Sequence, residues 1–441
     1  ERDRRNETKR NNTKNMGQVL SLPFKLLYTT FQYGNSLNSY IFGSERHKPF
    51  SSPSKKKFTT PFSSSLSNEK IELFEKNARI HLFSLASMFY LYKKPHYRKG
   101  TYRDDLIDNL RNVAIPGTGI PLSWFVTNRL VLYLSLQFCA PPVALLASLH
   151  KWFVSRGESS ISLEYATRLL APDDWFSYWR LNCNAVGLHS YLREFKKDYD
   201  MENKWTFLEQ GEKKGVPISP YLKEPKSIFI KHRNEEGGMG IFCYKNATAG
   251  GDWILQERIS NSEWVSSMLP DNAPLSTFRV ITQSKGALLS NDDEEKDNKT
   301  EVTALSCVFR AGRANALTDH DSILFDVDIT TGKILGGTTN AHWYKLGSVW
   351  SCPWRSKNHS FMHHPDVPEV QYQDIVIPDL DKMLRVAEES HAKLCPHVPF
   401  CGWDVVLCQE EPKLCLLEVN LSCNFFRGSF DKTVYMDYIE E

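Results

Sequence analysis

The sequence changes its pattern near residue 200, and this change limits the folds that the chain can adopt. From there to about residue 420, short runs rich in β-branched and aromatic residues alternate with turns: SIFIK, GIFCYK, WILQERI, STFRVITQ, TALSCVFR, SILFDVDI, WDVVL and LCLLEVN. Runs of this length and composition predict β-strands. The stretch LDKMLRVAEESHAKL reads as a helix between them. We therefore predict an α+β fold for residues 181–435.

The residues before this region favour helices. Within residues 71–180, Leu, Phe and Ala recur at spacings of three and four, as in KIELFEKNARIHLFSLASMFYLY. The run LVLYLSLQFCAPPVALLASL, residues 130–149, has no charged residue and reaches the roughly 20 residues that cross a bilayer. Because Pro141 and Pro142 interrupt it, we predict two buried helical segments or a hairpin on a membrane surface. A true membrane span is the less favoured alternative.

Residues 1–70 are predicted to form a tail without a core. The chain starts with ERDRRNETKRNNTKN, which is not a secretory signal, and we interpret residues 1–15 as upstream translation. From Met16 the sequence MGQVLS satisfies the pattern for myristoylation at Gly17, and the Ser-, Pro- and Lys-rich residues 44–70 read as a tether. A disordered tail with a chance motif explains the same residues equally well. We predict a cytoplasmic protein, with attachment to the cytosolic face of a membrane as a further possibility.

Charge and cysteine usage argue against two classes of site. The chain has 54 Lys and Arg residues against 52 acidic residues, without one long basic tract, so we predict no nucleic-acid partner. Its ten cysteines form no CxxC pair and mostly lie in apolar runs, which is typical of reduced, buried thiols in an intracellular protein. Cys395, His397 and Cys401 resemble half of a zinc site. Because a second paired half is missing from the sequence, we do not predict zinc there.

Oxygen-bearing side chains gather near the end of the sequence, in GWDVVLCQEEPKLCLLEVN. Side chains alternate between the two faces of a strand, so Glu418 and Asn420 share one face. The run GWDVVL reads as an antiparallel partner strand, and it brings Asp404 to that same face. Two carboxylates and an amide oxygen suit Mg²⁺ that holds nucleotide phosphates. A polar strand end that faces water is the alternative.

Upstream residues supply what a nucleotide site needs. Lys231 ends SIFIK and is followed by a glycine-rich loop whose backbone N–H groups could surround phosphate oxygens, although such a loop is more often a plain hairpin turn. After it, WILQERI predicts a strand whose end could bind and cover an adenine ring, and Glu263 could bind ribose hydroxyls. The predicted nucleotide-binding residues here are Lys231, Gly237, Gly238, Gly240, Gln256, Glu257, Ile259 and Glu263.

The order of these features resembles the ATP-grasp superfamily, and it is most similar to the sugar-transfer-associated ATP-grasp family. The resemblance covers roughly residues 180–430 and includes YDMENKWTFLEQGEKKGVPISP, STFRVIT and VFRAGRANALTDHDSILFDVDITTGKI. It implies two α+β subdomains that grip ATP, with Lys204 and Lys231 as the lysines that bind its phosphates. It also places Arg279 in the strand that has the family pattern Thr-x-Arg-Val-x-Thr. It further implies that Arg310 faces the transferred phosphate. The chain departs from the family pattern at Asn203 and at residues 320–322.

The resemblance also implies a reaction. ATP with one or two Mg²⁺ ions would activate a small-molecule carboxylate as an acyl-phosphate, and an amine or other nucleophile would then displace phosphate. The products would include ADP and phosphate, with Arg279 and Arg310 as catalytic residues and Asp404, Glu418 and Asn420 as metal ligands. Two alternatives stay open at this point. One is an ATP-dependent small-molecule kinase, and the other is a membrane-tethered, nucleotide-binding pseudoenzyme.

Overall fold

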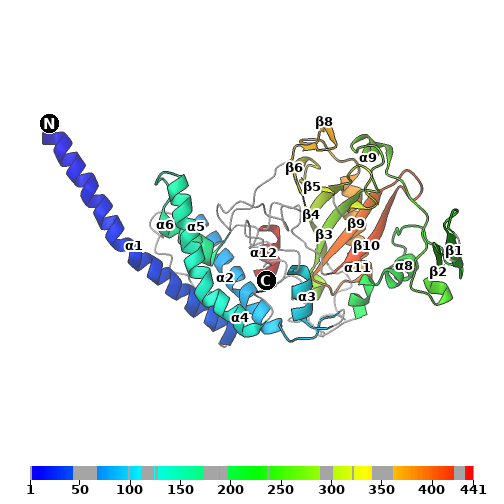
Figure 1. Ribbon diagram of the computed structural model, residues 1–441, viewed down its shortest axis with the longest axis horizontal. Helices are drawn as coiled ribbons and strands as arrows, with labels where there is room; N and C mark the ends of the chain where they lie inside the picture. The colour runs from blue at the N-terminus through cyan, green and yellow to red at the C-terminus, as the bar shows by residue number, and fades with distance from the viewer. Residues whose placement is uncertain are drawn as a thin grey trace. The chain divides into compact units, whose positions relative to one another are not determined.

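The computed structural model of the chain divides into two compact units (Figure 1). Unit 1 comprises residues 1–187, 341–358 and 431–441, and unit 2 comprises residues 188–340 and 359–430. The structure describes residues 2–42, 67–97, 100–110, 124, 128–172, 188, 197–235, 239–288, 301–319, 322–339, 361–421 and 433–440. Within these ranges it describes the side chains of all but residues 2–21, 108–110, 197 and 339. The fold is mixed α and β, as the sequence predicts.

Unit 1 is helical in the part that the structure describes. Its elements are α1 Arg2–Phe42, α2 Asn68–Leu91, α3 Tyr102–Leu110, α4 Arg129–Leu134, the π-helical turn η3 Ser135–Cys139, α5 Ala140–Val154, α6 Ile161–Leu170 and α12 Thr433–Glu440. A polar N-cap residue precedes each of α2, α4 and α6, namely Ser67, Asn128 and Ser160. The side chain of each N-cap accepts a hydrogen bond from a backbone N–H group of the first turn.

Helix α2 lies at the centre of unit 1. Residues 78–88 of α2 are buried, and among them are polar side chains that each find a partner. His81 Nε2 lies 3.1 Å from the carbonyl oxygen of Leu169 in α6, and Arg79 Nε donates to Glu440 Oε1 in α12 at 2.9 Å. The first contact joins α2 to α6, and the second joins α2 to α12. The second also neutralises Arg79, and a buried charge is tolerated only when it is paired.

The structure differs from the tail predicted for residues 1–70. Residues 22–42 continue α1, and Tyr33, Leu37 and Tyr40 are buried in unit 1. Apolar and aromatic side chains recur here at helical spacing, so this stretch can bury one face where the Ser- and Pro-rich tract cannot. Residues 44–66 of the predicted tether, and the side chains of the MGQVLS motif, lie outside the described parts.

The predicted interruption of residues 130–149 was wrong. Helices α4, η3 and α5 follow one another without a break over Arg129–Val154. Pro141 and Pro142 occupy the first positions of α5, where a missing N–H costs least, and the wider turn η3 precedes them. The hydroxyl of Tyr33 donates to the carbonyl oxygen of Leu136 within this turn, at 3.0 Å. The result is a single apolar helical stretch, long enough by length and composition to cross a membrane.

Unit 2 is built on a six-stranded antiparallel sheet in the order β10-β9-β3-β4-β5-β6 (Figure 1). The strands are β3 Thr277–Ser284, β4 Val302–Ala311, β5 Ile323–Val327, β6 Ile334–Thr339, β9 Phe400–Leu407 and β10 Leu414–Asn420. Helix α11, Leu380–Leu394, packs on β3, β4 and β9, and α8, Lys204–Lys213, packs on β10. All side chains of β9 are buried, so this strand forms the centre of the core.

Smaller elements surround this sheet. They are β1 Ser227–Lys231 paired with β2 Ile241–Lys245, β7 His363–His364 paired with β8 Val367–Gln371, the short helix α9 Glu263–Ser267, and the 3-10 turns η4 Lys197–Glu202, η5 Ala247–Ala249 and η6 Lys285–Ala287. The hairpin β1–β2 confirms that the glycine-rich loop joins two antiparallel strands.

Seven of the eight runs predicted as strands lie in strands, and WILQERI does not. This run is extended and makes only isolated bridges at Trp253 and Gln256. Conversely, β6 was not predicted, because its Gly336 and Gly337 disfavour a strand by composition. A Cβ atom on Gly337 would lie 2.7 Å from two ring carbons of Phe325, so glycine is required where β5 and β6 approach each other.

Candidate active site

Strands β9 and β10 bring the predicted oxygen ligands together. The register pairs Glu418 with Asp404 and Asn420 with Gly402, which confirms that these strands are antiparallel neighbours. The Nδ2 atom of Asn420 donates to Glu418 Oε1 at 3.3 Å. The register shifts between Leu416 and Glu418, and this β-bulge allows the adjacent residues Leu417 and Glu418 both to line the same pocket.

Asp404 is buried, with an exposed fraction of 5%, and two arginines neutralise it. Arg279 lies opposite it on β3 and donates to both carboxylate oxygens, Nε to Oδ1 at 2.5 Å and Nη2 to Oδ2 at 3.0 Å. Arg310 Nη1 on β4 donates to Oδ2 at 3.4 Å. Burial by itself raises the pKa of Asp404, but the two guanidinium charges outweigh it and hold that pKa below its usual value.

A second, partly buried carboxylate, Asp319, was not among the predicted site residues. It accepts a hydrogen bond from Arg310 Nη2 at 3.1 Å and one from Thr277 Oγ1 at 2.5 Å. Burial raises the pKa of Asp319 despite these contacts, and the negative charge of Asp404 adds to that rise. Arg310 therefore bridges two carboxylates with opposite pKa shifts. The sequence signal was weak, because Asp319 lies in a loop and is distant in sequence from Asp404.

Lys204 supplies a third positive charge. It is the first residue of α8, and the side chain of the preceding Asn203 caps this helix by accepting hydrogen bonds from two backbone N–H groups. Asparagine is among the side chains preferred at this position of a helix. The Nζ atom of Lys204 lies 2.9 Å from Glu418 Oε2, and its side chain is largely exposed. A negatively charged ligand can therefore reach it from solvent.

These charged groups lie at a pocket of about 1080 Å³ within unit 2. The predicted site residues that line it are Lys204, Gln256, Glu257, Ile259, Arg310, Asp404 and Glu418. Residues 254–261 form one wall and residues 272–275 another. Asn261 joins them, because its Nδ2 atom donates to the carbonyl oxygen of Pro274 at 3.0 Å and its Oδ1 atom accepts from the backbone N–H of Ser276 at 2.9 Å.

Part of the pocket wall is apolar. Ile259, Leu275 and Leu417 all line the pocket and pack against the buried cluster of Val406, Cys408 and Cys415. Gln256, next to this wall, donates from Nε2 to Ser219 Oγ at 2.6 Å. The pocket thus combines a charged region with a rigid apolar wall, an arrangement that suits a ligand with phosphates and a flat ring.

Other predicted residues are not among the described residues that line the pocket. Lys231 and Gly240 belong to the exposed hairpin β1–β2 and the turn between its strands, and Glu263 lies in the first turn of α9. Arg279 and Asn420 are hydrogen-bonded to residues that do line it, Asp404 and Glu418. Gly237 and Gly238 lie outside the described residues. The nucleotide-binding roles of these residues stay predictions.

The donor set fits a divalent cation such as Mg²⁺. Asp404 on β9 and Glu418 on β10 are paired neighbours on adjacent strands, and the amide of Asn420 is hydrogen-bonded to Glu418. Oxygen donors of this kind are those that Mg²⁺ prefers. Arg279 and Arg310 already neutralise Asp404, and Lys204 neutralises Glu418, so a cation bound by Glu418 would displace the ammonium group of Lys204 from it. That displacement would free Lys204 for a phosphate.

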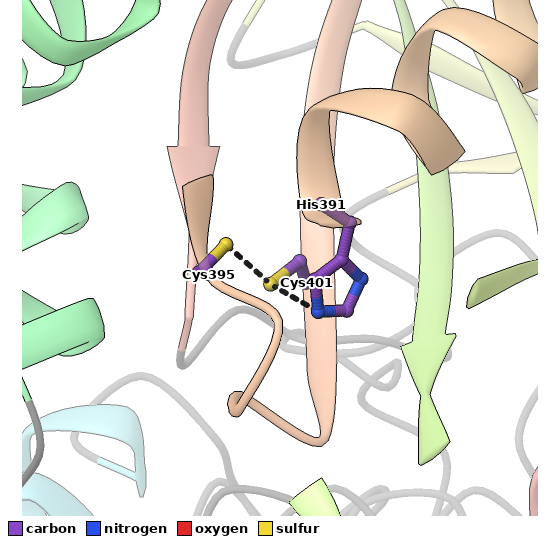
Figure 2. Close-up of side chains that lie close together, drawn as sticks. All are labelled: His391, Cys395 and Cys401. Carbon is purple, nitrogen blue, oxygen red and sulfur yellow. Dashed lines mark hydrogen bonds between the residues drawn. The ribbon is translucent and has the colours of Figure 1, made fainter. Parts of the chain in front are cut away.

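A separate cluster of His391, Cys395 and Cys401 is buried where α11 packs on β9 (Figure 2). The two sulfur atoms are 3.4 Å apart, and Cys401 Sγ lies 3.4 Å from His391 Nε2. The histidine is not the His397 of the predicted half-site. These are donors that zinc prefers, but both ring nitrogens of His391 have other partners: Nδ1 lies 2.7 Å from Thr282 Oγ1 and Nε2 lies 2.9 Å from the carbonyl oxygen of Val398. We interpret the cluster as part of the hydrogen-bonded core.

The protonation of His391 should affect folding. Burial lowers its pKa to about 4, below the value of about 6.5 expected in the unfolded chain. Between these two values the unfolded state binds more protons, so we expect stability to fall as the pH falls from 6.5 to 4. Urea unfolding of the wild type and of His391→Gln across this range measures the effect. The wild type should lose more stability than the variant, and equal slopes would contradict the prediction.

Comparison of the chain with protein-family models, with curated proteins and with solved structures gave no match.

Proposed function

We propose that unit 2 is an ATP- and Mg²⁺-dependent ligase of the ATP-grasp type, which activates a small-molecule carboxylate as an acyl-phosphate. The observation that carries the proposal is the group of Lys204, Arg310, Asp404 and Glu418 at one pocket that is large enough for a nucleotide. Phosphoryl transfer mainly requires positioning and neutralisation of charge. Positive side chains next to oxygen donors for a cation supply both.

The charged region would receive the phosphates. Lys204 is exposed and can turn from Glu418 to a phosphate oxygen, whereas Arg310 is held between Asp319 and Asp404 and points a fixed guanidinium at the pocket. A fixed charge favours the transition state over the ground state, because it needs no rearrangement when charge develops. Mg²⁺, when bound, would supply further positive charge at the outer phosphates.

The apolar wall would receive the adenine ring. Ile259, Leu275 and Leu417 offer a flat contact backed by the core, and the adjacent backbone of residues 256–259 carries hydrogen-bonding groups. This arrangement supports the roles that the resemblance implies for Gln256, Glu257 and Ile259. The hairpin β1–β2, which carries Lys231, is exposed on both strands and corresponds to the subdomain that would cover the nucleotide from its other side.

The affinity for nucleotide should depend on this wall. We expect Leu417→Ala to weaken ADP binding about tenfold, since roughly 1.4 kcal/mol of apolar contact with the ring would be lost. Titration with a fluorescent ADP analogue measures the dissociation constant. Val419→Ala in the same strand is the control, because Val419 is buried and does not line the pocket. An unchanged affinity in Leu417→Ala would place the ring elsewhere.

The reaction can be tested directly. The purified chain is incubated with Mg-ATP and pools of small carboxylic acids, and ADP, AMP, phosphate and pyrophosphate are measured. Release of ADP that depends on one acid, together with trapping of a hydroxamate by hydroxylamine, would support the ligase. AMP and pyrophosphate would refute the mechanism. ADP with a phosphorylated hydroxyl product would identify a kinase, and binding of ATP without turnover with any pool would favour the pseudoenzyme.

A further inference from the structure

Unit 1 exposes an apolar stripe along the whole helical stretch Arg129–Val154. Its members recur at intervals of about four residues, which places them on one face of the helix: Leu130, Leu134, Phe138, Leu146, Leu149 and Phe153. Phe138 and Phe153 are 68% and 75% exposed. Only 28% of the most apolar 18-residue window is buried. A helix in the core of a soluble protein would be mostly covered, so this stretch is not a core helix.

The neighbouring part of α1 shows the same property. Phe24, Leu27 and Phe31 are exposed, and Lys25 is the one charged residue between residues 22 and 42. The hydroxyl groups of Thr29 and Thr30 donate hydrogen bonds to the carbonyl oxygens of Lys25 and Leu26, at 2.9 and 2.8 Å. These hydroxyl groups are therefore satisfied within the helix. Monomeric soluble proteins rarely expose apolar side chains in such contiguous sets.

Several polar side chains lie at the contact between these two helices. Asn38 Oδ1 on α1 accepts hydrogen bonds from Tyr133 Oη at 3.0 Å and from Gln137 Nε2 at 2.8 Å. Tyr33 donates to the carbonyl oxygen of Leu136 at 3.0 Å. In a helix at an aqueous surface, the polar residues face out and the apolar residues face in. Here polar side chains join the two helices while large apolar side chains such as Phe24 and Phe138 are exposed, and polar contacts between helices with apolar outer faces are typical of helices in lipid.

The helices also approach closely where these contacts occur. A Cβ atom on Gly34 would lie 3.2 Å from Gln137 Oε1, so a small residue stands at the crossing. Phe42, farther along α1, packs against the ring of Tyr133 with centroids 5.7 Å apart. Gly34 of α1 thus lies near Gln137, and the later residue Phe42 lies near the earlier residue Tyr133. The two helices therefore run antiparallel. Small residues at crossings are a second property of helix packing in membranes.

Ion pairs on the inner side of this pair limit how deeply it can insert. Lys151 Nζ lies 2.6 Å from Glu164 Oε2 on α6, and Arg168 Nε lies 2.8 Å from Glu164 Oε1. Helix α6 has ten residues, about 15 Å, and is too short to span a bilayer beside α5. Charged groups at the middle of a bilayer are costly. A full span is therefore disfavoured.

We propose that residues 22–42 and 129–154 form a helix pair whose outer apolar face inserts into one leaflet of a phospholipid bilayer, while its inner face stays packed on α2 and α6. The anchor is independent of the ligase proposed for unit 2 and of any lipid on Gly17. The apolar side chains enter the acyl region, and the polar contacts of Asn38 remain shielded between the helices. The basic residues Arg129 and Lys151 near its two ends lie at headgroup level.

The test uses the full chain produced in bacteria without a myristoyltransferase and mixed, without detergent, with preformed vesicles of phosphatidylcholine and phosphatidylserine. We expect the protein to float with the vesicles in a density gradient. Phe138→Asp combined with Leu146→Asp should lower the bound fraction at least tenfold, because both charges would enter the acyl region. The matched control is Leu335→Asp, an exposed apolar position on β6 in unit 2. It should bind as the wild type does.

Any of four results would overturn the proposal. The first is wild-type protein that stays at the bottom of the gradient. The second is a double variant that floats like the wild type while melting at the same temperature. The third is protein that ignores preformed vesicles but resists carbonate extraction from the membranes of the producing cells, which would indicate a span. Light scattering that shows a dimer dissociated by the double variant, without vesicle binding, would assign the face to a second copy of the chain.

Discussion

Replacing Asp404 by asparagine is expected to abolish ATP turnover and also to lower the free energy of unfolding by about 3 kcal/mol. The carboxylate is buried and is the shared partner of Arg279 and Arg310, so its loss removes a negative charge that both of these largely buried guanidinium groups contact. Turnover is lost because the oxygen set for the cation is broken. Turnover is measured as ADP release, and stability by urea unfolding.

Glu418→Gln is the matched comparison for Asp404→Asn. It removes a charge from the same oxygen set, but its ion pair with Lys204 is solvent-exposed on the lysine side, and such pairs contribute about 1 kcal/mol or less. We therefore expect loss of turnover with nearly unchanged stability. If both variants turned over ATP at the wild-type rate, the oxygen set would have no role in the reaction. If Asp404→Asn were as stable as the wild type, the charge network inferred around it would be wrong.

Replacing Arg310 by methionine is expected to lower turnover about a thousandfold while changing the affinity for ATP less than about threefold. A positioned arginine that stabilises the transferred phosphoryl group has effects of roughly that size. An interaction made mainly in the transition state lowers kcat and leaves ground-state binding nearly unchanged. Asp404 keeps its two hydrogen bonds from Arg279 in this variant, and the raised pKa of Asp319 favours its neutral form once Arg310 is gone.

The control for this experiment is Arg313→Met. Arg313 also pairs with a carboxylate through two nitrogens, donating to Asp366 from Nε and Nη2 at 2.6 Å each, but it is not among the described residues that line the pocket. A purely structural role for Arg310 predicts similar kinetics in the two variants. A large rise in the dissociation constant for ATP in Arg310→Met would instead show that this arginine binds the ground state.

Much of unit 2 could be predicted from the sequence because strand formation and side-chain alternation are local properties. The β-rich runs that become β3, β4, β5, β9 and β10 are short and bounded by turns, and they form strands. A period of two places Glu418 and Asn420 on one face before any partner is known, and the short connection QEEPK predicts the antiparallel pairing with the strand of Asp404. The helix of α11 follows in the same way from its spacing of apolar residues.

Local patterns failed where a neighbour in space changed what a residue could do. Pro141 and Pro142 predicted a break, yet at the start of α5 they cost no hydrogen bond that the helix needs, and η3 takes up the change of pitch. Residues 22–42 were assigned to a tail, although α1 can bury one face there because α2 and α6 cover it. Neither outcome is visible in a single segment.

The sequence by itself determined where most of the strands of unit 2 lie and which of their side chains share a face, because both depend on neighbouring residues in the chain. The tertiary structure alone decided the charge network. Arg279 and Asp404 are 125 residues apart, and Arg310 and Asp404 are 94 residues apart, so only the pairing of β3 and β4 with the rest of the sheet brings them together. The same is true of Asn38 and Gln137, whose hydrogen bond lies between two helices that expose apolar faces. Such contacts depend on how distant segments pack, and no pattern in the sequence around either residue predicts its partner.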